Sequence, residues 1–216
     1  MRTNLPEVRF EYAFLLSEYA SEGLNTLWGD GTPLRSFDEY TEIVKKYAEW
    51  WKDDGDKIIR ELCRITELEF YQNTIDVYVA PWFYAFSSPM VLGVTFSSKN
   101  QFINTLTHEI IHRLLTDNTT YSREYDFLQL WRSLFGDHHE WNTLVHIPVH
   151  AIMQKLYIDV LNRPDLLELD KKDLNERGDK EYLAAWEYVE QQGYEAIIRK
   201  LKQHSSQMNI KQVTHE

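Results

Sequence analysis

Apolar residues near the start of the chain recur every three or four positions. This spacing places them on one face of a helix, so it predicts a helix from Pro6 to about Ala20. The apolar residues that carry the pattern are Leu5, Val8, Tyr12, Leu15 and Leu16.

Two further helices follow from their end signals. Ser36 and Glu39 have the spacing of a capping box, which predicts a helix that continues to about Lys52. The segment "DDG" interrupts it, and a third helix is expected from Asp56 to about Glu67.

The pattern changes to strict alternation between Asn73 and Pro81, which predicts a β-strand. One face of this strand carries Ile75, Val77 and Val79, and the other carries Asp76, Tyr78 and Ala80. An aromatic connection, "PWFYAFSSP", leads to a short segment rich in β-branched residues. We expect a second strand there, from Met90 to Ser97.

The remainder of the chain has the pattern of helices. One helix begins near Lys99 or Asn100, after the cap residues "SSKNQ", and stops around Asp117 and Asn118. Glycines at the expected helix ends support the later ones. These later helices are expected at Ser122–Leu134, Pro148–Asn162, Asp179–Gln191 and Tyr194–Gln203.

This order of elements predicts an α+β fold that is mostly helical, with a small β-sheet before the helix at residues 99–118. We expect a single domain over residues 1–216, of a size that buries a sizeable core. Within it, residues 1–118 would form an N-terminal lobe and residues 119–204 a helical lobe, with a loose tail at 205–216.

Charge and cysteine content restrict the function. The net charge is −11 and no basic patch stands out, so nucleic acid is not an expected partner. Cys63 is the one cysteine, which excludes an intrachain disulfide. No signal peptide and no apolar run of membrane-spanning length are found, so we expect a cytoplasmic protein without membrane contact. The oligomeric state is not predicted.

The segment "INTLTHEIIHRLLTDN" carries the chemistry, because it contains the pattern His-Glu-x-x-His. His108 and His112 are four residues apart, so a helix directs both imidazoles to one ion. Zinc accepts neutral imidazole and in catalytic sites keeps one position for water. Glu109, offset by one residue, is placed to take a proton from that water as the water attacks a carbonyl.

The stretch "TLTHEIIHRL" resembles the active-site helix of zincin metallopeptidases of the gluzincin-like superfamily. Thr105, uncharged Ile110 and Ile111, and apolar Leu114 match the residues that this superfamily favours around the motif. Arg113 departs, because that position is usually uncharged. The resemblance covers roughly residues 75–160 and implies a zincin-like domain that uses Zn²⁺ to hydrolyse peptide bonds.

A third zinc ligand is required, and the metzincin extension does not supply it, because Leu115 and Asn118 stand where Gly and His would be. The later helix offers His146 and His150, again four residues apart. Pro148 suits a first helical turn, which places His150 in regular helix and favours it as the ligand. His146 is the alternative, either as third ligand or as a donor to the developing oxyanion. The loop residues His138, His139 and Glu140 are weaker candidates.

By the same resemblance, the strand before the motif helix would be a sheet edge above the metal, where an extended substrate peptide adds by backbone hydrogen bonds. Gly93 and Val94 of the predicted Met90–Ser97 strand would bind substrate. Gly93 would permit close backbone approach.

Three functions remain open. The first is a zinc metallopeptidase with His108, His112 and His150 as ligands and Glu109 as general base, acting on a peptide or protein. The second is a zincin-like metal-binding domain without proteolytic activity that serves as a protein-interaction module. The third is a helical-bundle metal protein, such as a di-iron carboxylate protein, against which the strands argue.

Overall fold

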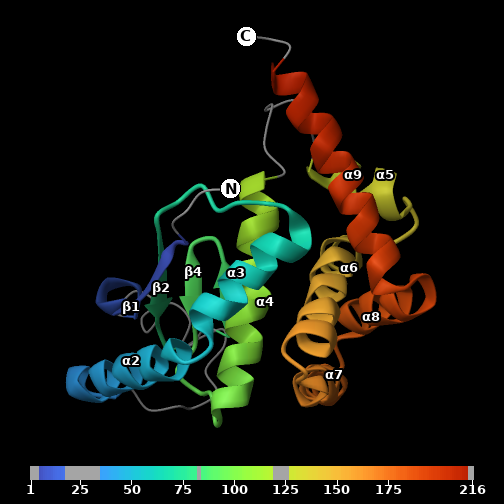
Figure 1. The fold of residues 1–216 in the computed structure, drawn as a ribbon. Coiled ribbons are helices and arrows are strands. Elements are labelled where there is room, and N and C mark those ends of the chain that lie inside the picture. The colour runs from blue at the N-terminus through green and yellow to red at the C-terminus, as the bar shows by residue number, and fades with distance from the viewer. Residues whose placement is uncertain (1–4, 18–34, 82–83, 119–126, 214–216) are drawn as a thin grey trace. The chain divides into compact units, whose positions relative to one another are not determined.

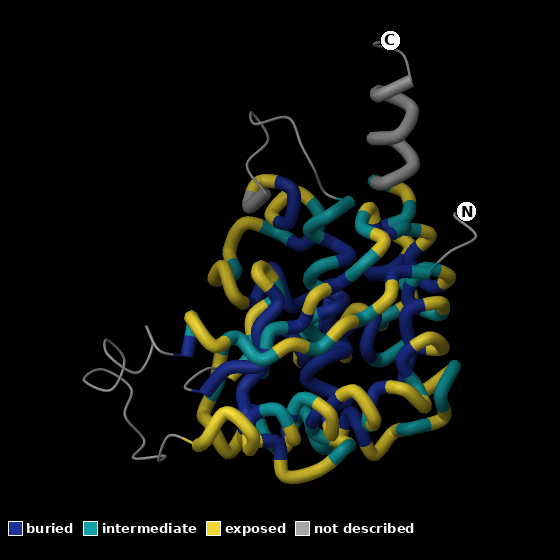
Figure 2. The backbone as a smooth tube through the Cα atoms, turned by 90° about the vertical axis from the view of Figure 1, so that its left-hand side faces the viewer, coloured by how far each residue is buried: buried dark blue, intermediate teal, exposed yellow. Residues whose placement is uncertain are grey.

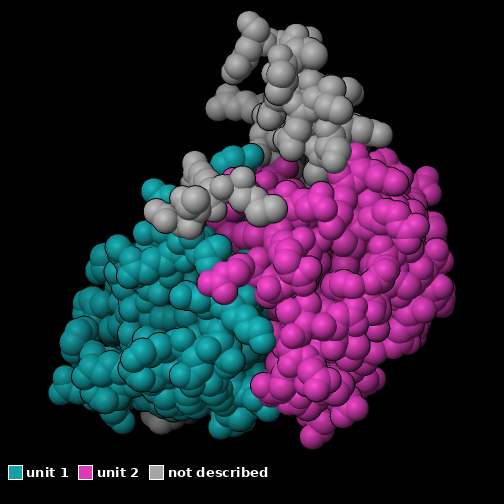
Figure 3. All heavy atoms as spheres, viewed as in Figure 1, with its two compact units in different colours: residues 1–59, 71–113 teal, residues 60–70, 114–216 magenta. Residues whose placement is uncertain are grey.

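The computed structural model describes residues 5–17, 35–81, 84–118 and 127–213. The chain forms two compact units (Figure 3). Unit 1 comprises Met1–Ile59 and Tyr71–Arg113, and unit 2 comprises Arg60–Phe70 and Leu114–Glu216. The division therefore differs from the predicted lobes. It falls inside a helix, after residue 113 instead of after residue 118, and it assigns residues 60–70 to the helical unit.

Unit 1 is built on a four-stranded mixed sheet with the order β1-β2-β4-β3 (Figure 1). β1 pairs with β2 in parallel, β2 pairs with β4 in parallel, and β3 pairs with β4 antiparallel. The strands are β1 Glu7–Tyr12, β2 Thr74–Val79, β3 Ala85–Ser87 and β4 Met90–Leu92.

The predicted helix from Pro6 to about Ala20 is wrong over its first half, because Glu7–Tyr12 is strand β1. Its sequence "EVRFEY" alternates exposed charged residues with half-buried Val8, Phe10 and Tyr12. The helical spacing depended on leucines that flank the strand. Parallel pairing with β2 over six residues supplies the backbone hydrogen bonds that favour the strand.

β2 confirms the predicted alternation, with Ile75, Val77 and Val79 buried. The second predicted strand is shorter than expected, since β4 ends at Leu92 instead of Ser97. β4 also lies inside the sheet, between β2 and β3. The edge strands are β1 and β3, and β3 arises from the aromatic connection and folds back on β4 as a hairpin.

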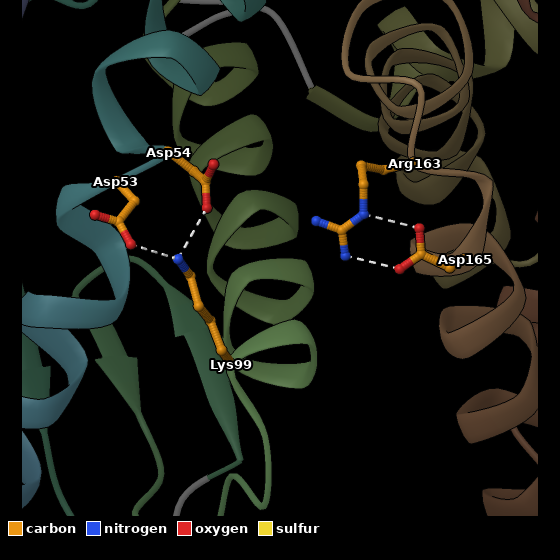
Figure 4. Close-up of polar contacts among 5 residues, drawn as sticks. All are labelled: Asp53, Asp54, Lys99, Arg163 and Asp165. Carbon is orange, nitrogen blue, oxygen red and sulfur yellow. Dashed lines mark hydrogen bonds and ion pairs between the residues drawn. The ribbon is translucent and has the colours of Figure 1, made fainter.

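The helices α2 and α4 begin where the residues that precede them predict. In α2 (Phe37–Lys52) the Ser36 backbone N–H donates to the Glu39 carboxylate at 2.7 Å, and the Glu39 N–H donates to the Ser36 hydroxyl at 3.3 Å. α3 (Gly55–Thr66) follows directly. The motif helix is α4 (Lys99–Asn118), as expected. Its first residue, Lys99, pairs with Asp53 at 2.9 Å and Asp54 at 3.2 Å (Figure 4).

An aromatic cluster fixes α4 against the sheet and α2. Phe102 is fully buried at its centre and contacts rings from β1 and α2. Four rings contact it at centroid distances from 4.7 to 5.9 Å, and these belong to Phe10, Tyr47, Trp50 and Phe96. Such offset and edge-on ring contacts add to the free energy of burial and hold the helix in one orientation.

Unit 2 is helical. Its central helix, α6, packs against α5, α8 and α9 and is buried without interruption from Thr143 to Met153. Figure 2 shows in dark blue where the chain is buried. The π-helical segment η1 continues α6, and an Arg163–Asp165 ion pair of 2.7 Å lies at the start of α7 (Figure 4). The elements are α5 Phe127–Phe135, α6 Trp141–Gln154, η1 Lys155–Val160, α7 Pro164–Arg177, α8 Lys180–Gln192 and α9 Tyr194–Val213.

Three expectations for unit 2 need correction. α6 begins at Trp141, so Pro148 lies inside the helix and not in its first turn. The burial of the whole helix offsets the hydrogen bond that an internal proline removes. α7 was not predicted, although Pro164 and Gly178 mark its two ends. α9 continues to Val213 through most of the predicted tail.

The expected helix at Ser122–Leu134 matches α5 in part, since its first five residues lie outside the described ranges. The longest helices in the described ranges, α4 and α9, have 20 residues each. No helix in these ranges combines the length and apolar character that a membrane crossing requires.

The aromatic cluster gives a stability prediction. Phe102→Ala leaves a cavity at the contact of α4, β1 and α2, so we expect the free energy of unfolding to fall by about 3–5 kcal/mol. The matched control is Phe37→Ala, because the Phe37 side chain is 62% exposed and its loss should cost less than about 1 kcal/mol. Urea denaturation followed by circular dichroism measures both. Equal losses would show that the cluster does not hold unit 1 together.

Candidate metal centre

The motif lies in the middle of α4, on the side of the helix that is not fully buried. The apolar residues of α4 before and within the motif are buried, and Phe102, Leu106 and Ile110 are fully inaccessible. His108, Glu109 and His112 are half-buried. The apolar surface of α4 therefore faces the core, and the three polar side chains of the motif are left on the remaining face.

The two histidines of α4 converge on one point. The Nε2 atom of His108 lies 3.1 Å from the Nε2 atom of His112, and the ring centroids are 4.8 Å apart. Two nitrogen ligands of a tetrahedral zinc ion, each at 2.0–2.1 Å, lie about 3.3 Å from each other. The pair thus has the spacing of a chelate. The same distance suits an N–H···N hydrogen bond when one Nε2 carries the proton.

Glu109 has an altered acidity. Burial raises the pKa of its carboxyl to about 8, from an ordinary value of 4.5, because the charged form loses solvation. In the metal-free protein the carboxyl is therefore protonated at neutral pH. A cation bound by the adjacent imidazoles would favour the carboxylate and lower this pKa.

His146 of α6 is held in a defined tautomer within unit 2. Its Nδ1 lies 2.6 Å from the backbone oxygen of Asn142, so Nδ1–H donates and Nε2 carries the lone pair. Burial lowers the pKa of His146 to about 4, which keeps the ring neutral. Its ring also packs on that of Tyr182 at a centroid distance of 3.8 Å. A neutral imidazole oriented by a backbone carbonyl has the form of a metal ligand.

His150 lies one turn later and is fully buried. Its ring stacks on Trp186 with 4.3 Å between centroids and 9° between planes. The argument that favoured His150 depended on a helix start at Pro148. Since α6 begins at Trp141, both histidines lie in regular helix and that argument is wrong. The choice between His146 and His150 stays a prediction.

Sequence reasoning did not find the residues that support these two histidines. Tyr182 and Trp186 of α8 are four residues apart, like the histidines that they stack on, so each turn of α8 supplies one ring to one turn of α6. The shared spacing was the available signal. The weaker candidates, His138 and His139, pack ring to ring at 4.0 Å, and His139 also contacts Tyr188.

The edge-strand argument for Gly93 and Val94 is wrong. Both residues follow the end of β4, which β3 separates from the sheet edge. The backbone N–H of Gly93 donates to the Tyr84 oxygen at 2.8 Å, and the Gly93 oxygen accepts from the Tyr47 hydroxyl at 3.1 Å. The Gly93 backbone is thus used inside unit 1, and the assignment of both residues to substrate binding stays a prediction without this support.

Comparisons with known proteins give no family. No protein-family model, no curated protein and no solved structure matches the chain. The likeness to zincins therefore rests on the motif and its place in a helix after a small sheet.

The raised pKa of Glu109 predicts how stability varies with pH in the metal-free protein. Between pH 4.5 and about 8, the folded state keeps a proton that the unfolded carboxyl has lost. The contribution of this proton to stability is full below pH 4.5 and is lost as the pH rises through about 8. In Glu109→Gln this loss is absent, so the variant should gain stability relative to wild type between pH 5 and 8.5.

Urea denaturation at several pH values, with a chelator present, measures this difference. The control is Glu49→Gln, which changes an exposed glutamate of α2. If wild type and Glu109→Gln show parallel pH profiles, the Glu109 carboxyl is not desolvated.

Proposed function

We propose that this protein is a zinc-dependent metallopeptidase that uses α4 as its active-site helix. The observation that carries the proposal is the 3.1 Å approach of the His108 and His112 Nε2 atoms, with Glu109 on the same half-buried side of the helix. Metal binding by α4 alone would need only the two histidines. The additional carboxyl, desolvated beside them, is the feature that a hydrolytic site uses and a structural zinc site does not need.

The third ligand in this proposal is His146, with Nε2 as the ligand atom. Each of the three histidines offers one ring nitrogen. His146 is supported by the Asn142 carbonyl, which fixes the tautomer, and by its neutral charge state. The ring of His150 is instead engaged face to face with Trp186, which suits a supporting role in the packing of α6 on α8.

In this proposal zinc and the Glu109 carboxyl have different roles in peptide hydrolysis. Zinc, when bound, polarises the substrate carbonyl and lowers the pKa of water. Glu109 accepts a proton from the attacking water and transfers it to the nitrogen of the departing amine as the C–N bond breaks. The Glu109 carboxyl would thus act as a base in the first step and as an acid in the second.

The substrate is a peptide or a protein segment, and the net charge of −11 argues against nucleic acid. We also propose a cytoplasmic location, which the single cysteine supports. The competing proposal is a metal-binding interaction module without turnover. The protonation of Glu109 in the metal-free protein favours that alternative, if the metal does not lower the pKa of the carboxyl.

Glu109→Gln separates the two proposals. The variant keeps all ligands, so it should bind one zinc per chain like the wild type. Its kcat/KM on a fluorogenic peptide library should fall about 100-fold to 10,000-fold, because the proton acceptor is lost. Zinc content is measured by atomic emission after dialysis.

Glu49→Gln again serves as the control and should keep full activity. Equal turnover by wild type and Glu109→Gln would contradict the assigned mechanism. One zinc per chain without turnover of any library member by the wild type would instead support the interaction module.

A further inference from the structure

Unit 1 contains a pocket of about 230 Å³ beside the first half of β2. It lies where β2 extends beyond the short strand β4. The two strands are parallel and their first paired residues are Tyr78 and Val91, so the first half of β2 lies before the start of β4, and no strand of the described residues pairs with it on that side. The residues that line the pocket and matter here are Thr74, Ile75, Asp76, Tyr78, Met90 and Arg113.

The pocket is lined by both apolar and polar residues. Ile75 and Met90 are apolar lining residues, and both are buried. Thr74, Asp76 and Tyr78 alternate with the buried positions of β2, so they share its other face, where two hydroxyls and one carboxylate are available. This combination suits a small ligand with one apolar group and one polar group.

Arg113 is the single cation among the described residues that line the pocket. It comes from α4 and also approaches the Ser88 hydroxyl at 3.4 Å, next to the hairpin turn between β3 and β4. A guanidinium presents five N–H donors in a planar fork that matches a carboxylate in two-point contact. The polar group of the ligand is therefore best matched by a carboxylate.

The position of Arg113 relates the pocket to the motif. Arg113 follows His112 directly and is four residues after Glu109, so it shares the helix side of the proposed general base. Four residues of α-helix span about 6 Å, the length of about two residues of an extended peptide. Arg113 is also the residue that departs from the zincin pattern, and a role in binding explains why a charge stands there.

We propose that this pocket binds the C-terminal residue of a short peptide, with the terminal carboxylate on Arg113 and its side chain against Ile75 and Met90. The carboxylate of Asp76, which also lines the pocket, disfavours an acidic side chain on the ligand, so the bound residue is apolar or neutral. In combination with the proposed function, on which this second part rests, cleavage occurs within about two residues of the peptide C-terminus.

Binding can be tested without catalysis. The probes are acetyl-alanyl-leucine with a free carboxylate and the same dipeptide as its C-terminal amide, titrated by calorimetry into the full-length, chelator-treated protein. We expect the free acid to bind at least about tenfold more tightly than the amide, since a charge-assisted contact to Arg113 is lost in the amide. Arg113→Gln should abolish this preference, and Arg113→Lys should retain part of it because the fork geometry is lost.

Arg35→Gln is the matched control, because Arg35 is an exposed arginine of the same unit, just before α2, and does not line the pocket. It should leave the preference unchanged. Equal binding of acid and amide by the wild type, or a preference that survives in Arg113→Gln, would overturn the proposal. Binding in the chelator-treated protein does not depend on turnover. If the wild type prefers the acid but Glu109→Gln hydrolyses peptides as fast as the wild type, the proposed function is refuted and the pocket assignment stands.

Discussion

The burial of α4 is the constraint on which the rest of the site depends. Phe102 and its aromatic neighbours attach the helix to β1 and α2, and the apolar residues that follow along the helix are buried as well. Because most of the α4 surface is buried, the side chains of the motif lie on the one side of the helix that is only half-buried. The convergence of the two Nε2 atoms of α4 follows from this restriction together with their i, i+4 spacing. A rigid helix of this kind is the support that a metal ligand pair requires.

Burial within each unit also determines the charge states of the groups involved. Desolvation raises the pKa of Glu109 and lowers the pKa of His146, so both groups are neutral at pH 7 without metal. Neutral imidazole is the form that binds zinc. A neutral carboxyl beside a cation readily releases its proton. Binding of zinc is therefore expected to be coupled to the loss of the Glu109 proton, which would convert this residue from an acid to a base.

Local signals in the sequence predicted the elements that matter most for this account. The Ser36–Glu39 capping box, the alternation in β2 and the length of α4 are all determined by residues close in sequence, and the structure confirms them. The mostly helical α+β class follows from the same signals.

Features that depend on distant residues were not predictable. β1 is a strand because β2 lies beside it, and its apolar residues also fitted a helical spacing. The proline inside α6 was interpreted as a helix start, since only the burial of α6 among its neighbours shows that the helix tolerates it. Strand order likewise cannot be inferred from the pattern, so the interior place of β4 and the pocket lined by Arg113 required the structure.

X-ray absorption spectroscopy of the zinc-loaded protein tests the central claim most directly, because it counts the ligands of the ion. The account predicts three imidazole nitrogens and one further light atom at about 2.0–2.1 Å, with no sulfur. His146→Ala should reduce the imidazole count to two, and His150→Ala should leave it at three. A wild-type spectrum with fewer than three imidazoles, or a loss that follows His150 instead of His146, would contradict the account.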